Sequence, residues 1–130
     1  MKIVLIADDN KKNLMQNFCI AYRSILSKQD LYATDSTGRV IEEVSNLTIN
    51  KFHAGLLGGD EQIATQIEQN NIDMVIYLRD ASSHNAPDVY VHEIIRLCDF
   101  HNIPIATNLS TAELLIRGLE RGDLEWRNYV

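Results

Sequence analysis

Carboxylates stand at three points where an apolar or glycine-rich run of the chain ends. Asp9 follows the first apolar run, Asp80 follows another, and Asp60 comes directly after Gly58 and Gly59. The two glycines would let the backbone approach a ligand closely, and the Asp60 carboxylate could then remove a proton as a general base. Each of these carboxylates could instead cap a helix or form an ion pair, so an enzymatic function requires that several of them act together.

A run rich in hydroxyl groups, Thr34-Asp-Ser-Thr-Gly38, could hold an anion. It stands where an apolar segment turns into a helical pattern, so the hydroxyls of Thr34, Ser36 and Thr37 and the first N–H groups of the helix could all point at one phosphate. Lys12 could add a positive charge. A simple helix cap and a solvent-exposed lysine are the competing interpretations, and the run taken alone favours the cap.

Other chemical signals in the chain are weaker. His84 lies in a polar loop, where it could serve as an acid–base group or simply face solvent. The sequence contains no nucleophile elbow, P-loop or dinucleotide-binding motif, and its histidines and cysteines lack the spacing of metal ligands, so we expect no metal site. Cys19 and Cys98 fall in apolar helical patterns, which predicts buried structural thiols.

The elements that must position these residues alternate along the chain. A helical spacing of apolar side chains follows each of five apolar runs, which predict strands at Lys2–Ala7, Leu31–Thr34, Ile49–His53, Met74–Leu78 and Ile103–Thr107. This alternation predicts an α/β fold, a three-layer αβα domain with a five-stranded parallel sheet. Ligands bind outside the carboxyl ends of the strands in such sheets, which is where the polar residues collect.

The first and last predicted helices have identifiable ends. The first carries apolar residues at helical spacing from Leu14 to Ile25, with Asp8 or Asp9 as its N-cap. The last begins at a cap within residues 108–111 and ends near Gly122.

Composition limits the partners to be expected. The 130 residues include 45% hydrophobic and 23% charged side chains, which is typical of one globular domain, here expected over residues 1–130. A net charge of −6 disfavours a nucleic-acid polymer as partner, because affinity for phosphate backbones depends on Lys and Arg. No apolar run approaches the roughly 20 residues that span a bilayer, and no targeting segment is recognised, so we expect no membrane association and a cytoplasmic location.

Motifs at the five strand ends identify a family resemblance. In order, the chain carries a strand followed by D-x-x-K, then L-Y-A-T-x-x-T-G, G-x-L-G-G-D-x-Q, L-R-D and I-P-x-A-T-N. Together these motifs resemble the methylglyoxal synthase family over essentially the whole chain. The resemblance implies a Rossmann-like fold, a homohexamer and one reaction without metal or organic cofactor. Dihydroxyacetone phosphate loses a proton beside its carbonyl, and the enediolate then expels phosphate to give methylglyoxal.

The resemblance also implies roles for single residues. Asp60 matches the family's catalytic base, and Asp9 and Asp80 match its supporting carboxylates. Arg127, in the L-E-W-R tail, matches an arginine that reaches the phosphate of a neighbouring subunit. The predicted site for a small phosphorylated molecule combines the family's phosphate-binding positions with their neighbours, and consists of Lys12, Thr34, Ser36, Thr37, Gly55, Gly58 and Gly59.

Three single positions depart from the family pattern. Asp8 stands where the family has a histidine near the substrate carbonyl. Asp35 replaces a glycine and brings a negative charge that would repel an anion within reach of the phosphate. Ala54 replaces a serine that donates to phosphate.

The loop after the fourth strand departs as well. The family pattern P-H-x-P-D-V, with a second catalytic histidine, reads S-H-N-A-P-D-V in this chain. An alignment without gaps places Pro87 on that histidine and Tyr90 on an associated aspartate. Sliding the loop by two or three residues lets His84 and Asp88 take those places, and both alignments are open.

These departures gather at the predicted site while the scaffold pattern is kept, which favours a changed function. One hypothesis is a carbon–oxygen lyase of the methylglyoxal synthase type, with His84 as a compensating catalytic group. Another is a catalytically silent protein that binds, senses or sequesters a phosphorylated metabolite or a (cyclic) nucleotide between subunits. A scaffold kept for contacts with partners is the third.

Overall fold

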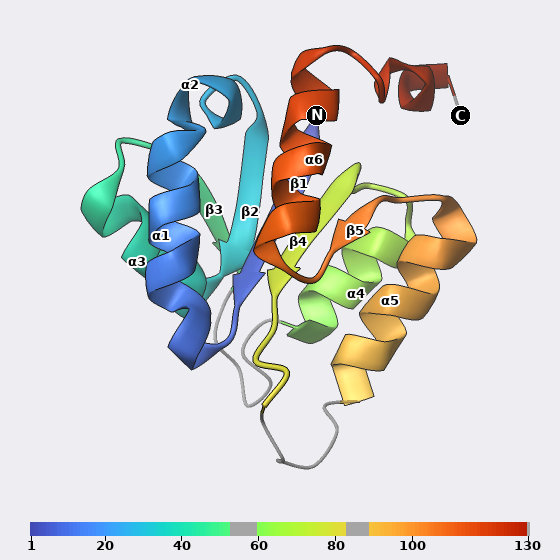
Figure 1. Cartoon of the computed structure of the whole chain (residues 1–130). Helices are drawn as coiled ribbons and strands as arrows, with labels where there is room; N and C mark the ends of the chain where they lie inside the picture. Colours follow the sequence, from blue (N-terminus) through green and yellow to red (C-terminus); the bar gives the residue numbers. More distant parts are fainter. Residues whose placement is uncertain (53–59, 83–88, 130) are drawn as a thin grey trace.

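The computed structural model describes residues 1–52, 60–82 and 89–129, and Figure 1 shows their arrangement. Within these residues the chain forms one parallel sheet of five strands in the order β3-β2-β1-β4-β5. The strands are β1 (Lys2–Ala7), β2 (Asp30–Thr34), β3 (Ile49–Phe52), β4 (Met74–Leu78) and β5 (Ile105–Ala106). The predicted α/β class and parallel sheet are confirmed.

Helices cover both faces of the sheet and make the three predicted layers (Figure 1). One face is covered by α1 (Lys12–Ala21), α2 (Arg23–Leu26), α3 (Asp35–Val44) and α6 (Leu109–Glu120), and the other by α4 (Asp60–Glu68) and α5 (Val89–His101). Short 3-10 turns, η1 (Asp9–Lys11) and η2 (Glu125–Tyr129), follow β1 and α6. Parallel strands require this cover because both of their faces are apolar.

The central strand β1 shows why polar residues begin only at the strand ends. Its alternate side chains point to opposite faces, so Ile3 and Leu5 pack with α1, α3 and α6, whereas Val4 and Ile6 pack with α4 and α5. None of the four is more than 4% exposed. Burying a side chain of this size stabilises the fold by roughly 1.5–3 kcal/mol, and a polar replacement would lose that stabilisation.

The first helix and the fifth strand differ from the sequence prediction. Tyr22, with φ −108° and ψ 22°, separates α1 from α2. The Tyr22 ring packs against Phe18 and its hydroxyl donates to Glu113 of α6, so a tertiary contact accompanies the break. The fifth strand is shorter than predicted at both ends, and at its amino end Pro104 has no N–H to donate, although its carbonyl still accepts from Val75 N.

Two further features bear on function. Cys19 and Cys98 are both buried, as predicted, and burial raises the pKa of each thiol to about 12. Both therefore stay protonated at neutral pH and behave as structural groups. Among the described residues, no helix is long and apolar enough to cross a membrane.

Candidate functional site

The carboxyl ends of β2, β1 and β4 lie side by side, and most of the described residues predicted to form a site follow them. β2 ends at Thr34, β1 ends at Ala7 just before Asp8, and β4 ends at Leu78, two residues before Asp80. This edge lies at the bottom of Figure 1. The strand order reverses between β1 and β4, which is the point where open α/β sheets bind ligands.

Thr34 and Thr37 form a buried pair of hydroxyls beside the end of β1. Thr34 Oγ1 donates to Thr37 Oγ1 at 2.9 Å, and the N–H of Ala7 donates to the same Thr37 oxygen at 3.3 Å. Thr34 occupies the N-cap position of α3, but its side chain makes no cap hydrogen bond. The interpretation of this hydroxyl as a simple cap is therefore wrong, because the hydroxyl is turned toward Thr37.

Lys12 brings a positive charge to the same strand end. Its Nζ donates to the carbonyl oxygen of Ala7 at 2.8 Å and lies 3.4 Å from a carboxylate oxygen of Asp9. The Lys12 side chain is 17% exposed, whereas that of Asp9 is fully exposed, so the ion pair contributes little to stability. The hydrogen bond to Ala7 uses one of the three N–H donors of the ammonium group. Lys12 and Thr37 thus bond to the two polar groups of one residue, Ala7.

Asp8 joins the end of β1 to the end of β4. Its Oδ2 accepts from the backbone N–H of Asp80 at 2.7 Å, and its Oδ1 accepts from the Tyr77 hydroxyl at 3.4 Å. The N–H of Asp8 donates to the carbonyl of Leu78 at 3.0 Å. Asp8 precedes η1 but makes no side-chain cap bond, and the N-cap position of α1 is held by Lys11, so the prediction that Asp8 or Asp9 caps the first helix is wrong. The carboxylate reaches across to β4 instead.

The Asp80 carboxylate is also engaged. The hydroxyl and the N–H of Ser82 donate to its Oδ1 at 2.6 and 3.0 Å. The Ser82 hydroxyl bond, followed by the Asn10 side chain, the Ser82 N–H and the charge of Lys11, holds the pKa of Asp80 below its ordinary value of 3.8. Asp80 is therefore ionised at neutral pH and can act as an acceptor or a fixed negative charge.

The first turn of α3 carries the other predicted anion-binding residues. Ser36 is exposed there, and Asp35 accepts a hydrogen bond from Arg39 Nε one turn later at 2.9 Å. A carboxylate at a helix N-terminus is stabilised by the helix dipole, and it competes with a bound anion for that end. The charge of Asp35 is thus partly balanced by Arg39 in the same helix.

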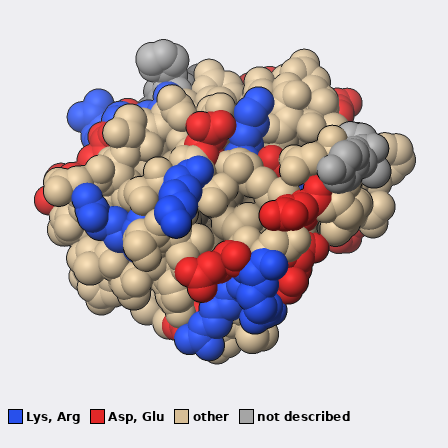
Figure 2. Space-filling view, turned by 90° about the horizontal axis from the view of Figure 1, so that it is seen from above, with Lys and Arg blue, Asp and Glu red and all other residues tan. Residues whose placement is uncertain are grey.

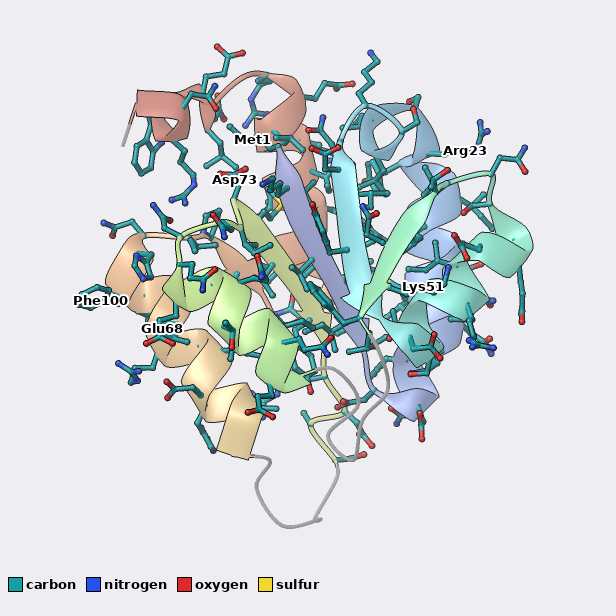
Figure 3. All side chains as sticks on the ribbon, turned by 180° about the vertical axis from the view of Figure 1, so that it is seen from behind. Met1, Arg23, Lys51, Glu68, Asp73 and Phe100 are labelled. Atoms are coloured by element: carbon teal, nitrogen blue, oxygen red, sulfur yellow. The ribbon has the colours of Figure 1, made fainter. Side chains whose placement is uncertain are left out.

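Arg127 does not lie with the other predicted site residues. It is buried at the opposite, amino edge of the sheet, where Figure 3 labels Asp73 and Met1. Its guanidinium donates to two side-chain oxygens and three carbonyls, those of Asn70, Asp73, Ile72, His101 and Asn102. All five of its N–H donors are used within the chain. Its predicted contact with a neighbouring subunit's phosphate stays a prediction.

Several predicted site residues fall outside the described part of the chain: Gly55, Gly58, Gly59 and His84, together with the departures Ala54 and Pro87. Asp60 is the first residue of α4, and only its backbone is described. Their predicted roles stay predictions, as does the choice between the two alignments of the loop around His84.

Three contacts at this edge come from residues to which the sequence analysis gave no role: Tyr77, Asn10 and Ser82. A sequence signal existed for Tyr77, because a tyrosine hydroxyl in a buried strand needs a polar partner. Asn10 and Ser82 each stand in a run of polar residues, and nothing in the sequence marks either of them out from its polar neighbours. Across residues 1–52, 60–82 and 89–129, no group of three or more His, Cys, Asp or Glu could hold a metal ion.

Comparison with known proteins shows which family shares this arrangement. A family model described as the MGS-like domain matches residues 15–107. The methylglyoxal synthase of Caldicellulosiruptor saccharolyticus is 55% identical over 130 residues, which cover 100% of this chain and 92% of that protein. The methylglyoxal synthase of Alkaliphilus metalliredigens is 52% identical, with coverage of 100% and 97%. This chain belongs to the methylglyoxal synthase family.

A solved structure supports the same assignment. The crystal structure of methylglyoxal synthase from Elizabethkingia anophelis NUHP1 matches with a TM-score of 0.79 at 34% identity, and the match covers 88% of this chain and 76% of that one. The methylglyoxal-synthase-like fold that the strand-end motifs predicted is confirmed.

Two carboxylates stand at the strand ends of this member of the methylglyoxal synthase family. They are Asp8 and Asp35, the positions that the sequence analysis interpreted as departures from the family pattern. Neither carboxylate is unpaired, since Asp8 accepts from Asp80 and Tyr77, and Asp35 accepts from Arg39. The chain therefore accommodates both negative charges by its own hydrogen bonds.

Proposed function

We propose that this chain converts dihydroxyacetone phosphate to methylglyoxal and inorganic phosphate. The supporting observation is that the Lys12 ammonium group and the Thr37 hydroxyl both form hydrogen bonds with the backbone of Ala7, beside the first turn of α3. A cation, hydroxyls and helix N–H groups together suit a phosphate monoester. The proposed phosphate-binding set is Lys12, Thr34, Ser36, Thr37, Gly55, Gly58 and Gly59.

The proposed reaction needs a base and fixed charges around the carbonyl group. Asp60 removes a proton from the hydroxymethyl carbon beside the carbonyl, and the enediolate that forms expels phosphate as the C–O bond breaks. The enol that remains takes up a proton at its CH2 carbon and becomes methylglyoxal. Asp9 and Asp80 support this step as carboxylates, and His84 supplies a donor near the developing oxyanion. Asp80 serves as an ionised acceptor, because its bonds from Ser82 and Asn10 lower its pKa.

Incubation of the purified protein with dihydroxyacetone phosphate tests this function. We expect methylglyoxal and phosphate to appear in equal amounts. Lys12→Met should raise KM by about 10-fold or more, because it removes a charged hydrogen-bond donor. The matched control, Lys28→Met, changes an exposed lysine at the other end of the sheet and should behave as the parent. The absence of turnover above buffer contradicts the proposal.

A second candidate function is binding without chemistry, in which the protein senses or sequesters a phosphorylated metabolite or a (cyclic) nucleotide. The observation that favours it is Asp8, whose two oxygens both accept hydrogen bonds where the family pattern predicts a donor. Loss of one oxyanion donor costs roughly 10²–10³ in rate. Calorimetry with sugar phosphates, nucleotides and cyclic nucleotides decides it: tight binding without turnover supports this function, and no binding eliminates it.

We further propose that residues 1–130 act as one domain within a cytoplasmic homohexamer. This proposal rests on the membership of the chain in the methylglyoxal synthase family. Figure 2 shows Lys and Arg interspersed with Asp and Glu on the face at the amino edge, which does not suit a nucleic-acid polymer. Sedimentation velocity tests the assembly, and a monomer at micromolar concentration contradicts it.

A further inference from the structure

The carboxylate of Asp8 occupies the junction where the strand order of the sheet reverses. β1 and β4 pair in parallel up to Ala7 and Leu78, and Asp8 is the next residue of its strand. Beyond that pair, two hydrogen bonds hold the segments after β1 and β4 together. The N–H of Asp8 donates to the Leu78 carbonyl, and the Asp8 carboxylate accepts from the Asp80 N–H. Asp8 therefore extends the pairing of the strands past the end of the sheet.

The contacts of Asp8 lead directly to a predicted site carboxylate. Asp8 fixes the backbone of Asp80, and the Asp80 carboxylate in turn accepts from the side chain and N–H of Ser82. Asn10, two residues after Asp8, helps to lower the pKa of Asp80. Asp8 thus holds the main chain of Asp80, and Ser82 holds its side chain.

We propose that Asp8 is a positioning residue of this site, which sets the place and direction of the Asp80 carboxylate through the Asp80 N–H. Its effect on turnover rests on the function proposed above, whereas its effect on Asp80 does not. A charged acceptor 2.7 Å from an N–H makes one of the stronger hydrogen bonds in a protein. The role differs from that of a catalytic donor, because both Asp8 oxygens accept.

Two substitutions of Asp8 distinguish the effect of its hydrogen bond to the Asp80 N–H from the effect of its negative charge. Asp8→Ala removes the acceptor of the Asp80 N–H altogether. Asp8→Asn removes the charge but keeps one side-chain oxygen that can accept the same bond. Glu43→Ala is the matched control, because it removes an exposed carboxylate on α3 far along the helix from this junction.

Amide hydrogen exchange at Asp80 reports whether its N–H is held in a hydrogen bond, and the measurement does not depend on enzymatic activity. We expect exchange of the Asp80 N–H to quicken about 10-fold or more in Asp8→Ala, and by less than about 3-fold in Asp8→Asn, as for loss of a bond to a charged group. Glu43→Ala should leave it unchanged. Unaltered exchange at Asp80 in Asp8→Ala overturns the proposal, whatever the activity. Because Asp8→Asn keeps an acceptor, it remains informative where Asp8→Ala fails to fold.

Ligand measurements connect that position to the site. For dihydroxyacetone phosphate we expect kcat to fall about 10-fold in Asp8→Ala with a smaller change in KM, and Asp8→Asn to recover most of the loss. Binding of 2-phosphoglycolate, which resembles the enediolate, is followed in parallel. Weaker binding of this probe in Asp8→Ala supports the positioning role even where the parent protein shows no turnover. Absence of turnover in the parent contradicts only the proposed reaction. Faster Asp80 exchange with kcat and probe affinity both unchanged overturns the role in the site.

Discussion

Thr37 is fully buried, yet its side chain carries a hydroxyl group that accepts a hydrogen bond from the last residue of β1. Its oxygen accepts from the N–H of Ala7 and from the Thr34 hydroxyl, so one side chain of α3 satisfies two polar groups beside the central strand. A buried N–H without an acceptor is costly, which makes this hydroxyl structural as well as a candidate ligand for phosphate.

Thr37→Val keeps the shape of the side chain and removes its oxygen. The N–H of Ala7 then loses its acceptor, and we expect the free energy of unfolding to fall by about 1–3 kcal/mol. Urea denaturation measures the change. Thr65→Val, which alters an exposed threonine bonded within α4, should cost much less. Equal losses in the two variants contradict the structural role of Thr37.

The carboxylate of Asp80 gives the stability a dependence on pH. Its pKa lies below 3.8 in the folded protein, chiefly because Ser82 donates to it, so the ionised form stabilises the fold. This contribution is complete above the ordinary value of 3.8 and is lost as the pH falls through the lower folded-state value. Asp80→Asn should therefore be less stable than the parent at about pH 6, and the difference should shrink below about pH 4. A constant difference across this range, measured by denaturation, contradicts the argument.

At the scale of elements, the approach of α3 to β3 depends on one glycine. A Cβ atom on Gly38 would lie 2.6 Å from Lys51 Cγ and 3.2 Å from Ile49 Cγ2. The helix that begins at the candidate anion site is thus pressed against the edge strand, and Thr37 next to Gly38 is held facing β1.

Gly38→Ala tests this close approach. The overlap with Lys51 should cost about 1–3 kcal/mol of stability and outweigh the helix-propensity gain of about 1 kcal/mol. In a Lys51→Ala background the overlap with Cγ is gone, so the same substitution should be neutral or stabilising. Gly118→Ala in α6 is the control, because its nearest atom, Asp123 Oδ2, lies 3.3 Å away. Additive effects of the Gly38 and Lys51 substitutions contradict the explanation.

At the scale of the whole molecule, Arg127 connects the C-terminal turn to the amino edge of the sheet. Asn70 and Asn102, both with positive φ, follow the ends of α4 and α5, and both supply an oxygen to its guanidinium. The negative ends of two helix dipoles therefore face one buried positive charge. Asp73, which also accepts from the N–H of Lys2, completes the set.

Arg127→Met should lower the free energy of unfolding by about 3 kcal/mol, because it leaves buried carbonyls and a carboxylate without a donor. Arg121→Met, which removes an exposed arginine paired with Asp123, should change stability by less than about 1 kcal/mol. Chemical denaturation of the two variants provides the comparison. A loss in Arg127→Met no larger than that in Arg121→Met contradicts the structural role.

Much of the fold and part of the candidate site were predictable because they rest on local patterns. β1 and β4 were predicted with the bounds that the structure has, since a strand buried on both faces must be continuously apolar. Asn108 was predicted within the cap of the last helix, and its side chain accepts from the N–H of Thr111. The break at Tyr22 was not predictable, because it accompanies a contact with Glu113, distant in the sequence.

The sequence by itself determined the αβα layers, the edge of the sheet where polar residues gather, and the family, because all of these depend on periodicity and on motifs at strand ends. Only the tertiary structure decided which partners those residues choose. Asp8 or Asp9 was predicted to cap the first helix, and the Asp8 carboxylate instead accepts from the Asp80 N–H. The guanidinium of Arg127 binds carbonyls at the amino edge of its own chain, a set of partners that no motif indicated. A polar side chain of given type bonds to whichever donors or acceptors the packing brings within about 3 Å, and no local pattern contains that distance.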